Sequence, residues 1–79
     1  MNALSQRKAI AELLAFRVAN PNRGEKADMT ACDRILNRYC PLGKSIGAKR
    51  DARIKEQEAI LEESTQMESA LIMAGLLPR

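Results

Sequence analysis

The longest part of the chain without glycine or proline is the segment 48–74, which has 27 residues. Glycine and proline are the residues that most often interrupt a helix, so this segment can form one long helix. A rival segmentation breaks it at 63–65, where Thr65 and Glu68 have the spacing of a second capping box. We expect an unbroken helix over about 46–75, with Ser45 as its N-cap, because nothing in the segment forbids helix.

A first, shorter helix is expected over about 3–19. Apolar residues at helical spacing mark its buried face, which consists of Ile10, Leu13, Leu14 and Val18. Ser5 is a candidate N-cap. Pro21 ends the helix, because its ring disfavours the α conformation at the preceding residue.

A second helix is expected over about 30–40. Thr30 is its expected N-cap, with Asp28 as a rival. Its apolar face has the same helical spacing and consists of Cys32, Ile35, Leu36 and Tyr39. The sequence Pro41-Leu42-Gly43 ends it.

Residue usage agrees with this division. The helix-favouring types Ala, Leu, Glu, Lys, Arg, Gln and Met provide 48 of 79 residues, whereas Val, Ile and Thr provide 9. The sequence therefore predicts a small all-α protein with two short helices and one long C-terminal helix, in a single domain over residues 1–79. A core with one Phe, one Tyr and no Trp stabilises a monomer by only about 3–5 kcal/mol, so self-association would help.

The third helix carries an imperfect coiled-coil stripe, in which Ile46, Arg53, Ile60, Met67 and Ala74 recur every seven residues. This stripe predicts that the helix pairs antiparallel with a second copy, in an antiparallel or intertwined helical dimer. The expected interface residues are Ile54, Gln57, Ile60, Leu61, Ser64, Met67 and Leu71.

Charge is segregated along the same helix, with a net charge of +4 over residues 44–55 and −5 over residues 56–68. This order opposes the helix dipole, which favours anions at the N-terminus. Three interpretations remain open. Two antiparallel copies can match opposite charges; the basic half can bind nucleic acid or another polyanion; or the charges are solvated and form local pairs such as Asp51–Lys55. The candidate anion contacts are Lys44, Ser45, Lys49, Arg50 and Arg53.

Two motifs bear on the second interpretation. The segment 30–55 has the outline of a helix-turn-helix, in which the start of the second helix faces DNA. Gly43-Lys44-Ser45 matches the end of a phosphate-binding loop, but Arg38 stands where that motif needs its first glycine. A weaker phosphate site at the Gly43–Gly47 turn remains an alternative.

Other chemistry is not expected. The chain has no His and only two Cys. It therefore lacks both the usual general base and the four ligands of a structural zinc site. We therefore expect no enzyme activity, no metal and no cofactor. Cys32 and Cys40 are about 12 Å apart along one helix, too far for a disulfide, which indicates free thiols and a reducing, cytoplasmic location. The longest apolar run, 70–77, is too short to span a membrane.

The sequence thus favours a non-catalytic protein that works by association, as an adaptor, inhibitor or regulator. Its expected partners are a second copy of itself and another protein. The alternative is a small helix-turn-helix-like DNA-binding regulator that uses the basic start of the third helix.

Overall fold

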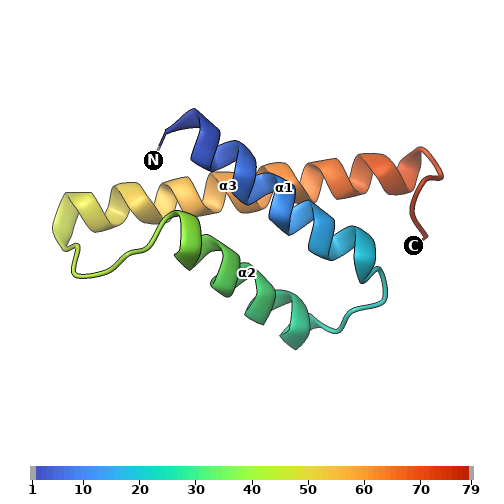
Figure 1. Cartoon of the computed structure of the whole chain (residues 1–79), viewed down its shortest axis with the longest axis horizontal. Helices are drawn as coiled ribbons and strands as arrows, with labels where there is room; N and C mark the ends of the chain where they lie inside the picture. The colour runs from blue at the N-terminus through green and yellow to red at the C-terminus, as the bar shows by residue number, and fades with distance from the viewer. Residues whose placement is uncertain (1, 79) are drawn as a thin grey trace.

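The computed structural model describes residues 2–78 and consists of three α-helices (Figure 1). Helix α1 spans Ala3–Ala19, α2 spans Glu25–Tyr39 and α3 spans Gly47–Met73. Strands are absent from residues 2–78. The predicted all-α class, with two short helices before one long helix, is confirmed.

Helix α1 is the central element of the fold. It packs against both other helices, whereas α2 and α3 contact each other only slightly. Figure 1 shows α1 crossing over the middle of α3, with α2 beside it. The resulting shape is flat and elongated, 42 × 25 × 16 Å, with a radius of gyration of 13.3 Å. A chain of this length packed as a compact globule would have about 12 Å.

The core lies where the three helices converge. Helix α1 contributes Ala9, Ile10 and Leu13, α2 contributes Cys32, Ile35 and Leu36, and α3 contributes Ile60. Tyr39 and Leu61 pack against its edge. The predicted apolar face of the second helix is therefore the buried face, as its spacing indicated.

Helix α3 is continuous through residues 63–65. Its 27 residues correspond to about 40 Å, nearly the full 42 Å length of the molecule. The shorter helices cover only its middle, so its last turns extend beyond α1 (Figure 1).

The starts of the helices differ from the sequence expectation. Asn2 caps α1, because its Oδ1 accepts a hydrogen bond of 2.8 Å from the backbone N–H of Ser5. Helix α2 begins at Glu25 after Gly24, five residues before the predicted start at Thr30. Ile46 rather than Ser45 occupies the N-cap of α3, and no side chain caps that helix.

Candidate functional site

A buried arginine joins the three helices. The side chain of Arg17 in α1 is almost fully buried, with 6% of its surface exposed. Its Nη1 donates to Thr65 Oγ1 at 2.9 Å and to Ser64 Oγ at 3.3 Å, both in α3. Its Nε lies 3.4 Å from Asp28 Oδ1 in α2, close enough for an ion pair but without hydrogen-bond geometry. Arg17 thus supplies polar contacts across the centre of the fold.

A second arginine continues this network from the loop between α1 and α2. Arg23 forms a bidentate pair with Glu68 of α3, with distances of 2.9 and 3.0 Å. Its Nε also donates to Asp28 Oδ1. The loop is therefore held to both α2 and α3 by side chains that are mostly shielded from water. We call Arg17, Arg23, Asp28 and Glu68 the ionic network.

Burial alone would raise the pKa of the Asp28 carboxyl. The hydrogen bond from Arg23 and the positive charges of Arg17 and Arg23 outweigh that cost, so its pKa lies below its ordinary value. The hydrogen bond from Arg23 to Glu68 is the main cause that raises the pKa of Arg23, and its hydrogen bond to Asp28 acts in the same direction. Asp28 therefore stays ionised and paired, as in a structural ion cluster rather than a catalytic acid.

The two cysteines are free, buried thiols. Burial and the nearby Asp28 carboxylate raise the pKa of Cys32. Burial and a hydrogen bond to Glu56, at 3.3 Å from Sγ, raise that of Cys40. A nucleophilic cysteine needs a lowered pKa, so neither thiol is activated.

The predicted dimer interface is largely occupied within the chain. Ile60 and Ser64 are fully buried, and Leu61 packs against the core. Gln57 donates to the carbonyl of Cys40 at 2.7 Å and so holds the end of α2. Ile54 and Leu71 are half-buried and Met67 is exposed. Of the stripe that recurs every seven residues, only Ile60 is thus buried in the core, whereas the other four members are exposed.

An apolar surface lies along α1 and the adjacent end of α3, and Met67 is its one residue that the sequence interpretation placed in an interface. Leu4, Ala11 and Val18 recur every seven residues on α1 and all are exposed. Leu14 and Ala11 line a hollow of about 390 Å³ with Met67 of α3, bounded by Arg7 and Glu63. We call these seven residues the α1/α3 patch.

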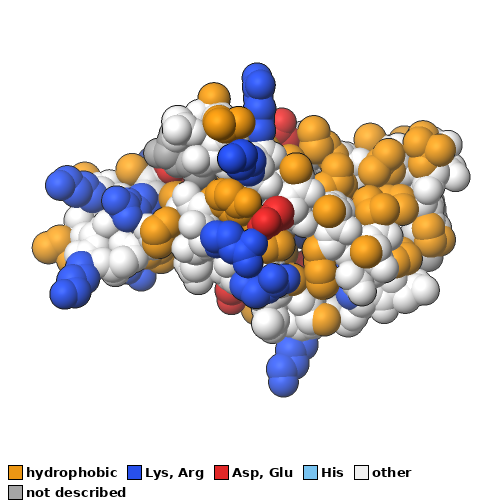
Figure 2. Space-filling view, in the orientation of Figure 1, with side chains coloured by type: hydrophobic (Ala, Val, Ile, Leu, Met, Phe, Trp, Pro, Cys, Tyr) orange, Lys and Arg blue, Asp and Glu red, His pale blue; other side chains and the backbone are white. Residues whose placement is uncertain are grey.

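The patch continues into the C-terminal end of α3. Met73 is 81% exposed and Leu76 is 72% exposed, and Leu71, Ile72 and Leu77 are half-buried. Figure 2 shows apolar side chains gathered over this end of the molecule, with almost no charged side chains among them. Large exposed apolar surfaces in small proteins mark interaction sites.

The predicted anion contacts gather at the opposite end of the molecule. Lys44, Lys49, Arg50 and Arg53 are exposed, and Ser45 is half-buried. Figure 2 shows basic side chains projecting from this end. Arg53 differs from the others, because its Nη1 donates to the carbonyl of Pro41 at 2.6 Å and so holds the loop before α3. Gly43 and Gly47 have positive φ angles of 53° and 60°, which explains their place in this turn.

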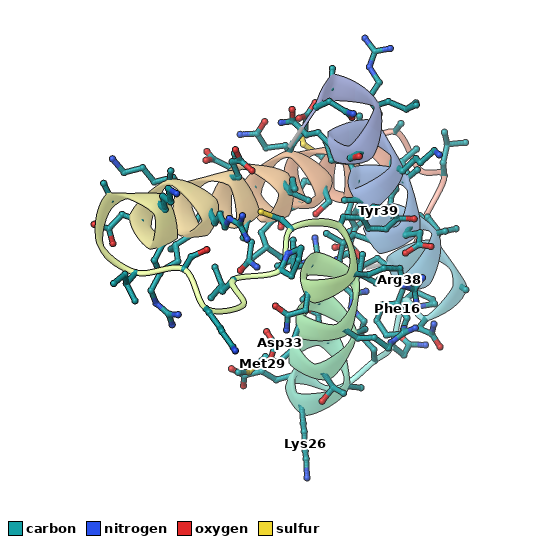
Figure 3. All side chains as sticks on the ribbon, turned by 60° about the vertical axis from the view of Figure 1, so that its left-hand side comes forward. Phe16, Lys26, Met29, Asp33, Arg38 and Tyr39 are labelled. Atoms are coloured by element: carbon teal, nitrogen blue, oxygen red, sulfur yellow. The ribbon has the colours of Figure 1, made fainter. Side chains whose placement is uncertain are left out.

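The arrangement of α2 and α3 differs from that of a helix-turn-helix. Residues 40–46 connect the two helices, whereas the motif uses a turn of about three or four residues. In that motif the two helices also pack together, but here both pack mainly on α1. Lys26, Met29 and Asp33 project from α2 away from α1 (Figure 3). By contrast, Arg38 pairs with Glu12 across the α1–α2 contact at 2.9 Å.

Comparison with known proteins gives no relative: no family model, no curated protein and no solved structure matches this chain. Within residues 2–78, no group of three or more Asp, Glu or Cys side chains has the geometry of a metal site. In the same range, no helix is long and apolar enough to cross a bilayer.

The sequence interpretation missed the ionic network and the outer face of α1. A signal was present, since Arg17 lies four residues after Leu13 and seven after Ile10, on the apolar face itself. Val18 was assigned to that face but is 40% exposed. Helical spacing fits either residue there, and apolar character alone favoured Val18.

Proposed function

We propose that this protein acts without catalysis, by association with a second copy of itself through the α1/α3 patch. The main support for this proposal is the exposed surface area of the chain. The chain exposes 5557 Å², about 800 Å² more than the roughly 4,800 Å² expected of a compact monomer of its mass. That excess equals one partner's share of a standard protein interface, about 800 Å².

The features of the patch favour a second copy as the occupant. Leu4, Ala11 and Val18 have the heptad spacing of a helix-pairing seam. Arg7 and Glu63 lie on the two sides of the hollow. A two-fold axis through the hollow would bring Arg7 of each copy toward Glu63 of the other, and such isologous pairs are the commonest oligomers. The dimer seam expected from the sequence thus moves from the centre of α3 to α1.

Two further parts of the proposal rest on the sidechain chemistry. The chain has no His and both thiol pKa values are raised, which supports a role in regulation or assembly rather than catalysis. The two buried free thiols also favour a reducing compartment such as the cytoplasm. If another protein bound the same patch in place of the second copy, this chain would act as an adaptor or inhibitor.

Sedimentation equilibrium tests the proposed dimer. We expect the wild type to have twice its 8.8 kDa chain mass at about 100 µM. Ala11→Glu places two like charges at the centre of the seam and leaves the core untouched, so this variant should be a monomer of unchanged helicity. Ala27→Glu, an equal change at an exposed position of α2, should leave the dimer intact. A monomeric wild type, or an Ala11→Glu variant that remains dimeric, would refute the proposal.

A further inference from the structure

We propose that the N-terminal end of α3 binds the phosphate backbone of a nucleic acid, independently of base sequence. The binding residues are Lys44, Lys49, Arg50 and Lys55, which we call the basic end. This surface lies at the end of the molecule opposite the apolar C-terminal end of α3 (Figure 2).

The first observation is that, among the described residues, these four side chains form no ion pair or hydrogen bond. Arg17, Arg23 and Arg38 each pair with a carboxylate. Within residues 2–78, no ion pair or hydrogen bond joins the side chains of the basic end to any carboxylate. The local pair between Asp51 and Lys55, which one of the three open interpretations included, is also absent from that range. The net charge over 44–55 is +4 against +3 for the whole chain, so the excess positive charge of the protein is concentrated here.

The second observation concerns the start of α3. Helix α2 carries Glu25 and Asp28 in its first turn, where acidic residues are favourable. The first turn of α3 has no acidic residue, and Lys49 and Arg50 lie at its start. Each cation there opposes the helix dipole, which is unfavourable. A bound phosphate removes this cost, since it complements both the cations and the free backbone N–H groups.

The type of partner follows from what surrounds the basic end. A protein partner would need an apolar interface centre, and a membrane surface would need an apolar helix face. Ile46 is the large apolar side chain exposed beside these cations at the start of α3, and the apolar C-terminal end of α3 lies at the other end of the molecule (Figure 2). Exposed cations without apolar or aromatic neighbours suit a backbone of repeated phosphates. They do not suit reading of unstacked bases.

Fluorescence anisotropy with a labelled DNA duplex tests this inference. Four phosphate contacts predict that log K falls with log salt with a slope of about −3 to −4. The double variant Lys49→Glu with Arg50→Glu should weaken binding at least about tenfold and reduce the slope by about two. Because glutamate at a helix start complements the dipole, this variant should fold at least as well as wild type.

The matched control is the double variant Lys8→Glu with Lys26→Glu. It changes the net charge equally at exposed positions outside the basic end, and Lys26 points away from the rest of the molecule (Figure 3). It should retain most of the binding. Equal weakening by both variants would contradict a defined site, as would binding to anionic vesicles without binding to the duplex. If Lys49→Glu with Arg50→Glu instead abolished the dimer and the wild type did not bind DNA, the basic end would pair with a second copy.

Discussion

The replacement Arg17→Ala tests whether the ionic network stabilises the fold. Breaking a buried ion pair costs about 3–5 kcal/mol when it leaves the partner unpaired. Here the cost should be lower, because Asp28 keeps its bond to Arg23 and Ser64 Oγ still donates to the carbonyl of Leu61 at 2.9 Å. Water can also reach Thr65, which is exposed. We therefore expect Arg17→Ala to lower the free energy of unfolding by about 2–3 kcal/mol.

Urea denaturation followed by circular dichroism measures this loss. A chain of this size has a denaturant slope near 1 kcal/mol per molar urea, so the midpoint should fall by about 2–3 M. Arg17→Met keeps the buried aliphatic volume without the charge and should stay within about 1 kcal/mol of wild type. Arg38→Ala removes the exposed pair with Glu12 and should cost at most about 1 kcal/mol. If Arg17→Ala cost no more than Arg38→Ala at the same protein concentration, the network would have no special role in stability.

Three further predictions concern other parts of the fold. Ile60→Ala creates a cavity at a fully buried position and should lower the free energy of unfolding by about 2–4 kcal/mol and the Tm by at least about 8 °C. An unchanged Tm together with loss of the proposed dimer would instead place Ile60 in an interface. Because the pKa of Asp28 is lowered in the folded state, its stabilising share is present above its unfolded pKa of about 3.9 and is lost as pH falls through the folded value. Asp28→Asn should therefore narrow the difference in urea midpoint between about pH 7 and pH 3, and an unchanged difference would contradict the assigned pairing. Ile46→Asp supplies the side-chain cap that α3 lacks and should raise the free energy of unfolding by about 0.5–2 kcal/mol, while weakening duplex binding at the basic end.

The number and order of the helices were predictable from the sequence. Glycine and proline separate the segments, and apolar spacing identified Cys32, Ile35 and Leu36 as the buried face of α2. These signals are local in the sequence, so the prediction did not depend on knowing which helices pack against one another. The continuity of α3 was predictable for the same reason, since no residue between 48 and 74 breaks a helix.

The starts of the helices were less predictable, because caps compete with tertiary contacts. Asp28 was a candidate cap, but Arg17 and Arg23 bind its carboxylate inside α2. The helix therefore extends back to Glu25. Without the position of the arginines, the sequence offers no reason to prefer this longer helix.

Two of the candidate interface residues, Ile60 and Ser64, are buried within the monomer, and the reason the sequence did not reveal this is related. Periodicity shows which face of α3 avoids water, but a face covered by another copy has the same pattern as one covered by α1. Ile60 illustrates this ambiguity, since it lies on the seven-residue stripe and is fully buried within the monomer. The exposed residues Leu4, Ala11 and Val18, spaced seven apart, were not predicted as an interface, because alanine contributes little to an apolar pattern.

The central position of α1 has a consequence for how the chain acquires its structure during synthesis. This helix precedes the other two in the chain, yet part of its contacts lie far along the chain, as with Arg17 and Ser64, which are 47 residues apart. In a nascent chain that ends before α3, helix α1 can pack on α2 but lacks α3, its other packing partner. We therefore expect the full native structure to form only once α3 is available, because the contacts between α1 and α3 must close before they stabilise the fold.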